Sequence, residues 1–153
     1  MPEVVDVTEL PTLKGREIGS SRWMTVTQEQ INTFATLTGD EQWIHVDEER
    51  AKSGPYGMTI AHGFFVLSCS TGLLYELLEV RNAASIINYG LNRVRFMSPT
   101  LVNSRVRMGL KVTDVAEVAG GYQVTFGLTF EREGQEKPVC VAELLFRYYA
   151  PAS

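Results

Sequence analysis

Hydrophobic and polar side chains alternate over long stretches in the second half of the chain. Residues 104–113 and 121–131 both follow this pattern, and residues 138–149 are expected to form the last strand. Between the first two, residues 114–120 are expected to form a turn that Gly120 and Gly121 close. Alternation with one hydrophobic side is typical of an antiparallel sheet that has one solvated face. In residues 104–113 the predicted inward set is Val106, Met108, Leu110 and Val112.

The strand expected over residues 86–96 has a different pattern. Ile87, Tyr89 and Leu91 share one side, but the other side mixes asparagines with small and hydrophobic residues. Neither set of side chains has the polar composition expected of a face that is exposed to solvent. This strand is therefore predicted to lie beside a polar site or a subunit contact.

Residues 63–78 are hydrophobic on nearly every side, as expected for a helix that is buried. In a domain this small, a buried helix needs a sheet wrapped around it. The pattern therefore predicts an α+β hot-dog fold, in which an antiparallel sheet of about five strands wraps around a central hydrophobic helix. The hydrophobic positions of the helix are Phe64, Phe65, Val66, Leu67, Leu73, Leu74, Leu77 and Leu78.

The first third of the chain carries local start and stop signals. Residues 1–17 are expected to lie over the domain surface, and residues 18–26 to be extended. The sequence Thr27-Gln28-Glu29-Gln30 is a capping box, which predicts an amphipathic helix that ends at Gly39. Asp47 is a predicted N-cap for a short helix over residues 48–53.

Length and composition narrow the class of protein. The 153 residues fit one domain, 1–153, and the net charge of −4 argues against a nucleic-acid partner. Residues 1–19 contain no uninterrupted apolar segment, and the apolar run 63–78 is too short and too polar to span a bilayer. No membrane association is expected, the default location is cytoplasmic, and Cys69 and Cys140 are expected to be free thiols.

Both histidines of the chain, His45 and His62, lie within residues 38–68. Asp40 and His45 are five residues apart, so they cannot share a face of a regular helix or strand, and Gly39 supplies the break that lets the backbone turn. Histidine is the usual base near neutral pH, and a carboxylate can orient a water beside it. The alternative is that Asp40 only ends a helix and His45 is an ordinary buried histidine.

Gly63 stands where a loop becomes the hydrophobic helix. The first turn of a helix leaves N–H groups without intrahelical acceptors, and the positive end of the helix dipole lies there. Glycine leaves room for a ligand to approach the backbone closely. Gly63 is therefore a candidate anchor for a carbonyl or oxyanion.

These two motifs together carry a family resemblance. Gly39-Asp40-x-Gln42-x-Ile44-His45-x-Asp47, followed by Ile60-Ala61-His62-Gly63, resembles the MaoC-like dehydratases, the R-specific type-2 enoyl-CoA hydratases with a hot-dog fold. The segment 88–96 is also similar to a strand of that family, and the resemblance covers residues 23–149. Many members have Asn-Pro where this chain has Gln42-Trp43, which leaves the acyl-chain preference open.

The resemblance implies roles for several residues. Asp40 and His45 would hold and activate a water, and the Gly63 N–H would bind a thioester carbonyl. Thr71 matches a hydroxyl residue that shapes the site. The resemblance assigns no catalytic role to His62, which is expected to pack or to make a structural hydrogen bond, with direct contact to substrate as the alternative. Asn92 would either bind ligand or tie strands together.

The implied activity is reversible hydration of a trans-2-enoyl thioester to the (R)-3-hydroxyacyl form. Coenzyme A would be part of the substrate, and no other cofactor or metal is expected. Arg93 and Arg95 would either meet its phosphates or lie on a solvated face. A homodimer is expected, with the strand over 86–96 near the interface. The alternatives are a hot-dog thioesterase and a non-catalytic acyl-thioester-binding or dimer-partner subunit.

Overall fold

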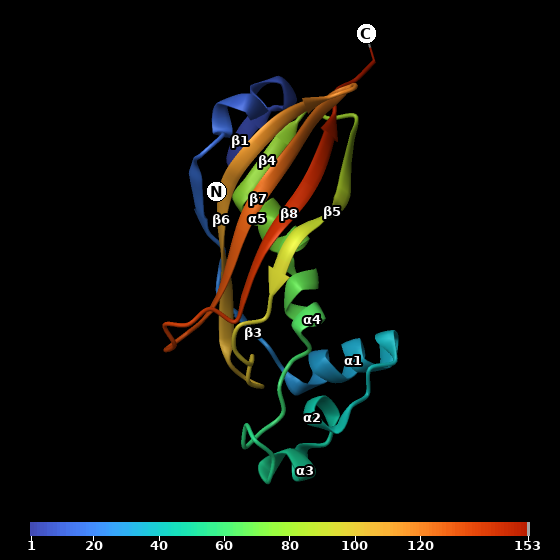
Figure 1. Cartoon of the computed structure of the whole chain (residues 1–153), viewed down its shortest axis with the longest axis vertical. Helices are drawn as coiled ribbons and strands as arrows, with labels where there is room; N and C mark the ends of the chain where they lie inside the picture. The colour runs from blue at the N-terminus through green and yellow to red at the C-terminus, as the bar shows by residue number, and fades with distance from the viewer. Residues whose placement is uncertain (153) are drawn as a thin grey trace.

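The computed structural model describes residues 1–152, and an antiparallel sheet forms one layer of it (Figure 1). The strand order is β2-β6-β7-β8-β5, with β3 also paired to β6. The predicted inward positions of β6 are buried, as are alternate residues of β7, so the one-sided alternation is confirmed. The strands are β2 (Glu17–Ser20), β3 (Met24–Thr25), β5 (Ser85–Arg95), β6 (Arg105–Val118), β7 (Gly121–Arg132) and β8 (Cys140–Tyr149).

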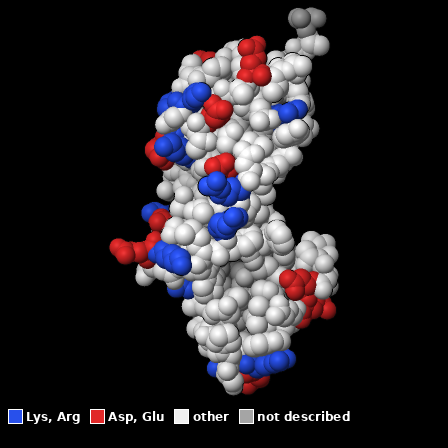
Figure 2. Space-filling view, viewed as in Figure 1, with Lys and Arg blue, Asp and Glu red and all other residues white. Residues whose placement is uncertain are grey.

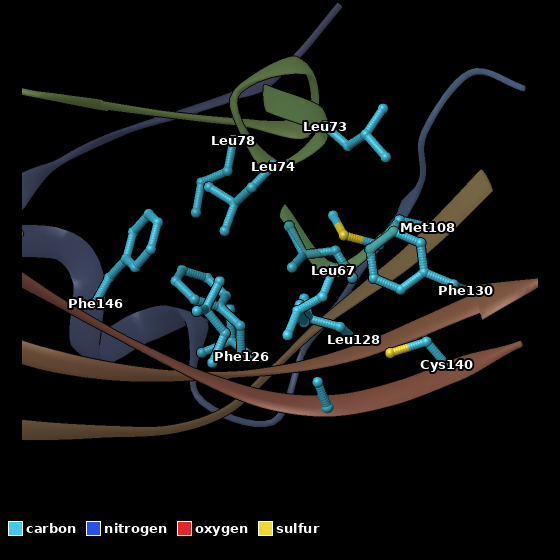
Figure 3. Close-up of a cluster of buried hydrophobic side chains, with 14 of the residues drawn as sticks. Leu67, Leu73, Leu74, Leu78, Met108, Phe126, Leu128, Phe130, Cys140 and Phe146 are labelled. Atoms are coloured by element: carbon cyan, nitrogen blue, oxygen red, sulfur yellow. The ribbon is translucent and has the colours of Figure 1, made fainter. Parts of the chain in front are cut away.

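The hydrophobic helical segment packs on one face of this sheet, as predicted for the hot-dog fold, and Figure 1 shows its second half behind β7 and β8. It is two helices instead of one, α4 (Gly63–Ser68) and α5 (Ser70–Leu77). At Cys69 the backbone has ψ −12°, and its N–H donates to the Val66 carbonyl three residues back, so one tight turn interrupts the α-helical bonding. Figure 3 shows Leu67, Leu73 and Leu74 of these helices packed with aromatic and aliphatic side chains of the sheet.

The N-terminal segment contributes to the core, so the prediction that it only covers the surface is wrong. Strand β1 (Glu3–Asp6) pairs in parallel with β4 (Leu78–Arg81), and the 3-10 helix η1 (Val7–Leu13) follows. Val7, Leu10 and Leu13 are buried. Their three-residue spacing matches the three residues per turn of a 3-10 helix, so they share one face.

The turn predicted over residues 114–120 is present only at residues 119–120, where Gly120 has φ 83°, because β6 runs to Val118. A shift in the register between β6 and β7 falls between Val112 and Asp114. Such a bulge ends the regular alternation without ending the strand. That is why the sequence pattern alone suggested that the strand stopped there.

Three further helices lie beyond the strands, next to the lower end of α4 in Figure 1. They are α1 (Gln28–Thr38), α2 (Trp43–Val46) and α3 (Glu48–Lys52). The predicted capping box of Thr27 is confirmed, and α1 ends at Gly39, which has φ 82°. Asp47 caps α3 as predicted, since its carboxylate accepts from the Arg50 N–H.

The surface carries charges of both signs. Figure 2 shows acidic and basic side chains interspersed on the face that it presents, and ion pairs such as Arg107–Glu131 join neighbouring strands. Cys69 and Cys140 are free thiols, as expected. Among residues 1–152, no helix is long and apolar enough to cross a membrane.

Candidate active site

His45 is fixed in one orientation by backbone groups. The residue is buried in α2, and its Nδ1 lies 2.7 Å from the Ile60 carbonyl oxygen. Since a carbonyl can only accept, Nδ1 carries the hydrogen and the neutral ring keeps its lone pair on Nε2. The Ile60 N–H donates in turn to the Ile44 carbonyl at 3.0 Å, which ties α2 to the segment before α4.

Asp40 faces this lone pair. Gly39 turns the chain out of α1 in the left-handed conformation, and the Asp40 Oδ2 then lies 4.0 Å from the His45 Nε2. That separation is too long for a direct hydrogen bond. The Asp40 side chain is 56% exposed, whereas the His45 side chain is almost fully covered. The predicted pairing of Asp40 with His45 is therefore present in the geometry.

The environment of His45 favours the neutral imidazole. Burial lowers its pKa, and the neighbouring His62 ring acts in the same direction. The hydrogen bond to the Ile60 carbonyl and the Asp40 carboxylate oppose this, but the net pKa is below the usual value of a histidine. A neutral His45 can accept a proton at neutral pH.

Gly63 and His45 line the same cavity, which has a volume of about 360 Å³. Gly63 is the first residue of α4, so its N–H has no intrahelical acceptor. The wall of this cavity also includes Tyr56, Ile60, Val66, Phe96, Met97 and Pro99. A carbonyl in the cavity could thus reach both the base and a helix N-terminus.

Phe96 closes the space beside Gly63. A β-carbon built on Gly63 would lie 2.7 Å from the Phe96 ring, which is closer than real contacts allow. The Phe96 ring also packs edge-on against Phe64, with centroids 5.9 Å apart. A glycine is therefore needed at position 63 for Phe96 to keep its place.

His62 is 3% exposed and makes a structural hydrogen bond, one of the two roles considered for it above. Its Nε2 lies 2.9 Å from the main-chain carbonyl oxygen of Asp40. Its ring stacks on His45, with centroids 3.8 Å apart and planes 22° apart. Side-chain ligand atoms of Asp40, His45 and His62 all lie within 4.8 Å of one another.

This geometry can be compared with known proteins. Residues 9–132 match the family described as MaoC like domain. The chain belongs to this family. The 3-hydroxyacyl-thioester dehydratase Z of Mycobacterium tuberculosis is 48% identical over 145 residues, which cover 94% of this chain and 96% of that protein.

Two solved structures show the same fold at low sequence identity. The (R)-hydratase from A. caviae involved in PHA biosynthesis superimposes with a TM-score of 0.70 at 21% identity, covering 89% of this chain and 98% of that one. The HadBC complex, a 3R-hydroxyacyl-ACP dehydratase from Mycobacterium tuberculosis, gives 0.71 at 17% identity, covering 88% and 96%. The resemblance to the MaoC-like family and the hot-dog fold are thus both confirmed.

In this MaoC-like chain, Gln28 supports His45 in a way that the sequence did not reveal. The Gln28 Nε2 donates to the His45 carbonyl at 2.8 Å, and the Gln28 Oε1 accepts from the buried hydroxyl of Thr59. Gln28 opens α1, where polar residues are ordinary, so the helical pattern gives no sign of this contact. The bond between Gln28 and Thr59 spans 31 residues, and the bond between Gln28 and His45 joins α1 to α2. Both bonds therefore depend on the folded arrangement of these segments.

Thr71 and Asn92 do not line the cavity that holds His45 and Gly63. Thr71 is half-buried in α5, about two helical turns beyond Gly63. Asn92 is exposed on β5, in an irregular step between Leu91 and Arg93. Among the residues that the structure describes, neither belongs to the cavity wall that holds His45. Arg93 and Arg95 are likewise exposed on β5.

Trp43 is part of the Gln42-Trp43 sequence that differs from the family pattern, and its ring faces α3. The Arg50 guanidinium lies over the Trp43 ring, 4.3 Å from its centroid. A β-carbon on Gly54 would touch the same ring at 3.0 Å. Trp43 therefore packs between α2 and the end of α3, on the outer side of the helix that carries His45.

Proposed function

We propose that this protein catalyses the reversible hydration of a trans-2-enoyl thioester to the (R)-3-hydroxyacyl thioester, with coenzyme A as the carrier. The observation that carries the proposal is that His45 and Gly63 line one cavity, while the Asp40 carboxylate lies 4.0 Å from the His45 Nε2. The 48% identity to a protein named 3-hydroxyacyl-thioester dehydratase supports the substrate class. The stereochemistry rests on the family resemblance.

The proposed chemistry needs no group besides the substrate, water and these residues. A water between Asp40 and His45 can donate one hydrogen to each, because an oxygen placed there lies within hydrogen-bond distance of both. His45 accepts its proton as the oxygen bonds to Cβ of the enoyl group. The electron pair moves to the thioester oxygen, where the Gly63 N–H and the helix dipole stabilise the charge. The Asp40/His45 pair then returns a proton to Cα, and the electron pair on the thioester oxygen re-forms the carbonyl.

The direct test is the loss of enoyl-thioester absorbance on addition of the protein, measured over a series of acyl chain lengths. We expect hydration with at least one chain length, and the reverse reaction from the (R)-3-hydroxyacyl thioester but not from its (S) isomer. A thiol-reactive dye in parallel reports thioester cleavage. Release of thiol without formation of the hydroxyacyl product would indicate a thioesterase, and no change in either signal would indicate a non-catalytic binding subunit.

We also propose a homodimer formed through β5. This strand is the edge of the sheet, so its outer backbone groups lack strand partners within the described chain. Ile87, Tyr89 and Leu91 on it are exposed, and Phe64 of α4 and Tyr75 of α5 are exposed as well. An exposed edge strand with hydrophobic side chains favours pairing with another chain. In such a dimer, Thr71 and Asn92 would lie near the shared surface.

Leu91→Glu is expected to convert the dimer to a monomer, because it places a charge on the proposed contact strand. Light scattering at micromolar protein concentration measures the change in mass. The matched control is Leu37→Glu, which adds the same charge at a residue that is 81% exposed on α1, and this variant should remain dimeric. A wild-type monomer with full activity would contradict the proposed assembly.

A further inference from the structure

His62 is held in a single tautomer by its surroundings. Its Nε2 lies 2.9 Å from the Asp40 carbonyl oxygen, which can only accept, so Nε2 carries the hydrogen. Its Nδ1 is buried and has no hydrogen-bond partner in the part of the chain that the structure describes. A hydrogen on Nδ1 would be a buried donor without an acceptor, so the geometry leaves this nitrogen bare.

The two stacked histidines consequently have opposite tautomers. His45 donates from Nδ1 to Ile60 and presents a bare Nε2 to Asp40, whereas His62 donates from Nε2 to the backbone of Asp40. Among residues 1–152, the ionisable groups of this cluster are Asp40, His45 and His62. The element α1 contributes the uncharged ring of Phe34, whose centroid lies 4.9 Å from that of His62.

Asp40 has few other anchors. Its carboxylate is largely exposed, and its N–H reaches the Thr38 hydroxyl only at 3.5 Å. The neighbouring Glu41 carboxylate meets the Thr36 hydroxyl at 3.4 Å, also a long contact. The 2.9 Å bond from His62 is shorter than either, and it comes from a buried side chain. The Gly39 N–H, which donates to the Ala35 carbonyl at 2.9 Å, directs the chain toward His45, and the His62 bond then holds the Asp40 carbonyl itself in place.

We propose that His62 is a positioning residue, which uses one buried ring to hold the Asp40 main chain by a hydrogen bond and to support the face of His45. The ring thereby sets the gap between the Asp40 carboxylate and the His45 Nε2. The catalytic consequence of this arrangement rests on the hydration activity proposed above. The geometric consequence does not, because it concerns how Asp40 and His45 lie in the unliganded protein.

Two substitutions of His62 test the hydrogen-bond donor and the aromatic ring separately. His62→Phe keeps an aromatic ring against His45 but has no donor, and His62→Gln places an amide N–H near the Nε2 position but has no ring. Both variants lack a second imidazole, so any difference between them cannot come from its charge. We expect kcat to fall at least about 10-fold in His62→Phe, because Asp40 shifts, with KM little changed. His62→Gln should recover most of this loss.

Nuclear magnetic resonance gives a readout that does not need enzyme activity. The chain has only two histidines, so in either variant the single remaining imidazole signal belongs to His45. The His45 pKa should be lower in His62→Phe than in His62→Gln, because the Asp40 carboxylate that raises it is no longer held nearby. In the wild type, ¹⁵N shifts should show the Nδ1–H tautomer for His45 and the Nε2–H tautomer for His62.

The outcomes that would overturn the inference are specific. Equal His45 pKa values in the two variants, when both are folded by circular dichroism, would show that the donor does not place Asp40. The Nδ1–H tautomer of His62 at neutral pH would contradict the assigned hydrogen bond, because Nε2 would then have no hydrogen to donate. If no hydration is found for the wild type, the proposed function fails, but the titration and the tautomers still decide the role of His62.

Discussion

Asp40→Asn and His45→Gln are each expected to lower turnover at least about 100-fold, because each removes one of the two groups that act on the water. Asp40→Asn should leave the fold intact, since His62 bonds to the main chain of Asp40 and the carboxylate itself is largely exposed. His45→Gln also removes the bond to the Ile60 carbonyl, so its melting temperature should fall as well. Absorbance kinetics and thermal melts measure the two effects separately.

The double variant decides whether the two residues work together. Since both act on one water, the loss in the double variant should be close to that of the worse single variant and not the product of the two. Glu41→Gln is the matched control, because it neutralises the adjacent exposed carboxylate and should keep full activity. Full activity in either single variant would remove the pair from the mechanism.

The features predictable from the sequence depend on residues close together in the chain. The capping box at Thr27, the left-handed Gly39 and the N-cap Asp47 are each complete within a few positions. The buried faces of β6 and β7 follow from two-residue periodicity alone. Because Gly39 and the caps fix where α1 ends and α3 begins, they also fix the turn that brings Asp40 toward His45.

The features that the sequence did not reveal depend on distant partners. β1 is short and becomes recognisable only through its pairing with β4, which lies more than seventy residues further along the chain. Gln28 gains its role from its contact with the His45 carbonyl, and helical periodicity carries no information about such a contact. Thr71 and Asn92 do not lie in the wall of the cavity that holds His45, so their roles remain predictions.

Gly63 illustrates how a distant partner changes an expected result. Within a helix, an alanine is normally more stable than a glycine by roughly 0.5–1 kcal/mol, so the sequence predicts that Gly63→Ala keeps or raises stability. The structure places the Phe96 ring 2.7 Å from the added β-carbon. Phe96 comes from the segment after β5, so this contact is invisible in the local sequence. We therefore expect Gly63→Ala to give no gain in stability in the wild-type background.

Gly63→Ala is expected to lower kcat/KM by about 10-fold or more, equivalent to about 1.4 kcal/mol, because a β-carbon obstructs the approach of the thioester carbonyl to the N–H. Gly63→Val should be worse. Adding Phe96→Ala separates the two consequences of the β-carbon. In that background Gly63→Ala should raise the melting temperature, since the clash is gone, and should still lower kcat/KM relative to Phe96→Ala alone. If removal of the Phe96 ring restores activity to Gly63→Ala, the glycine serves packing, and the carbonyl anchor lies at another N–H.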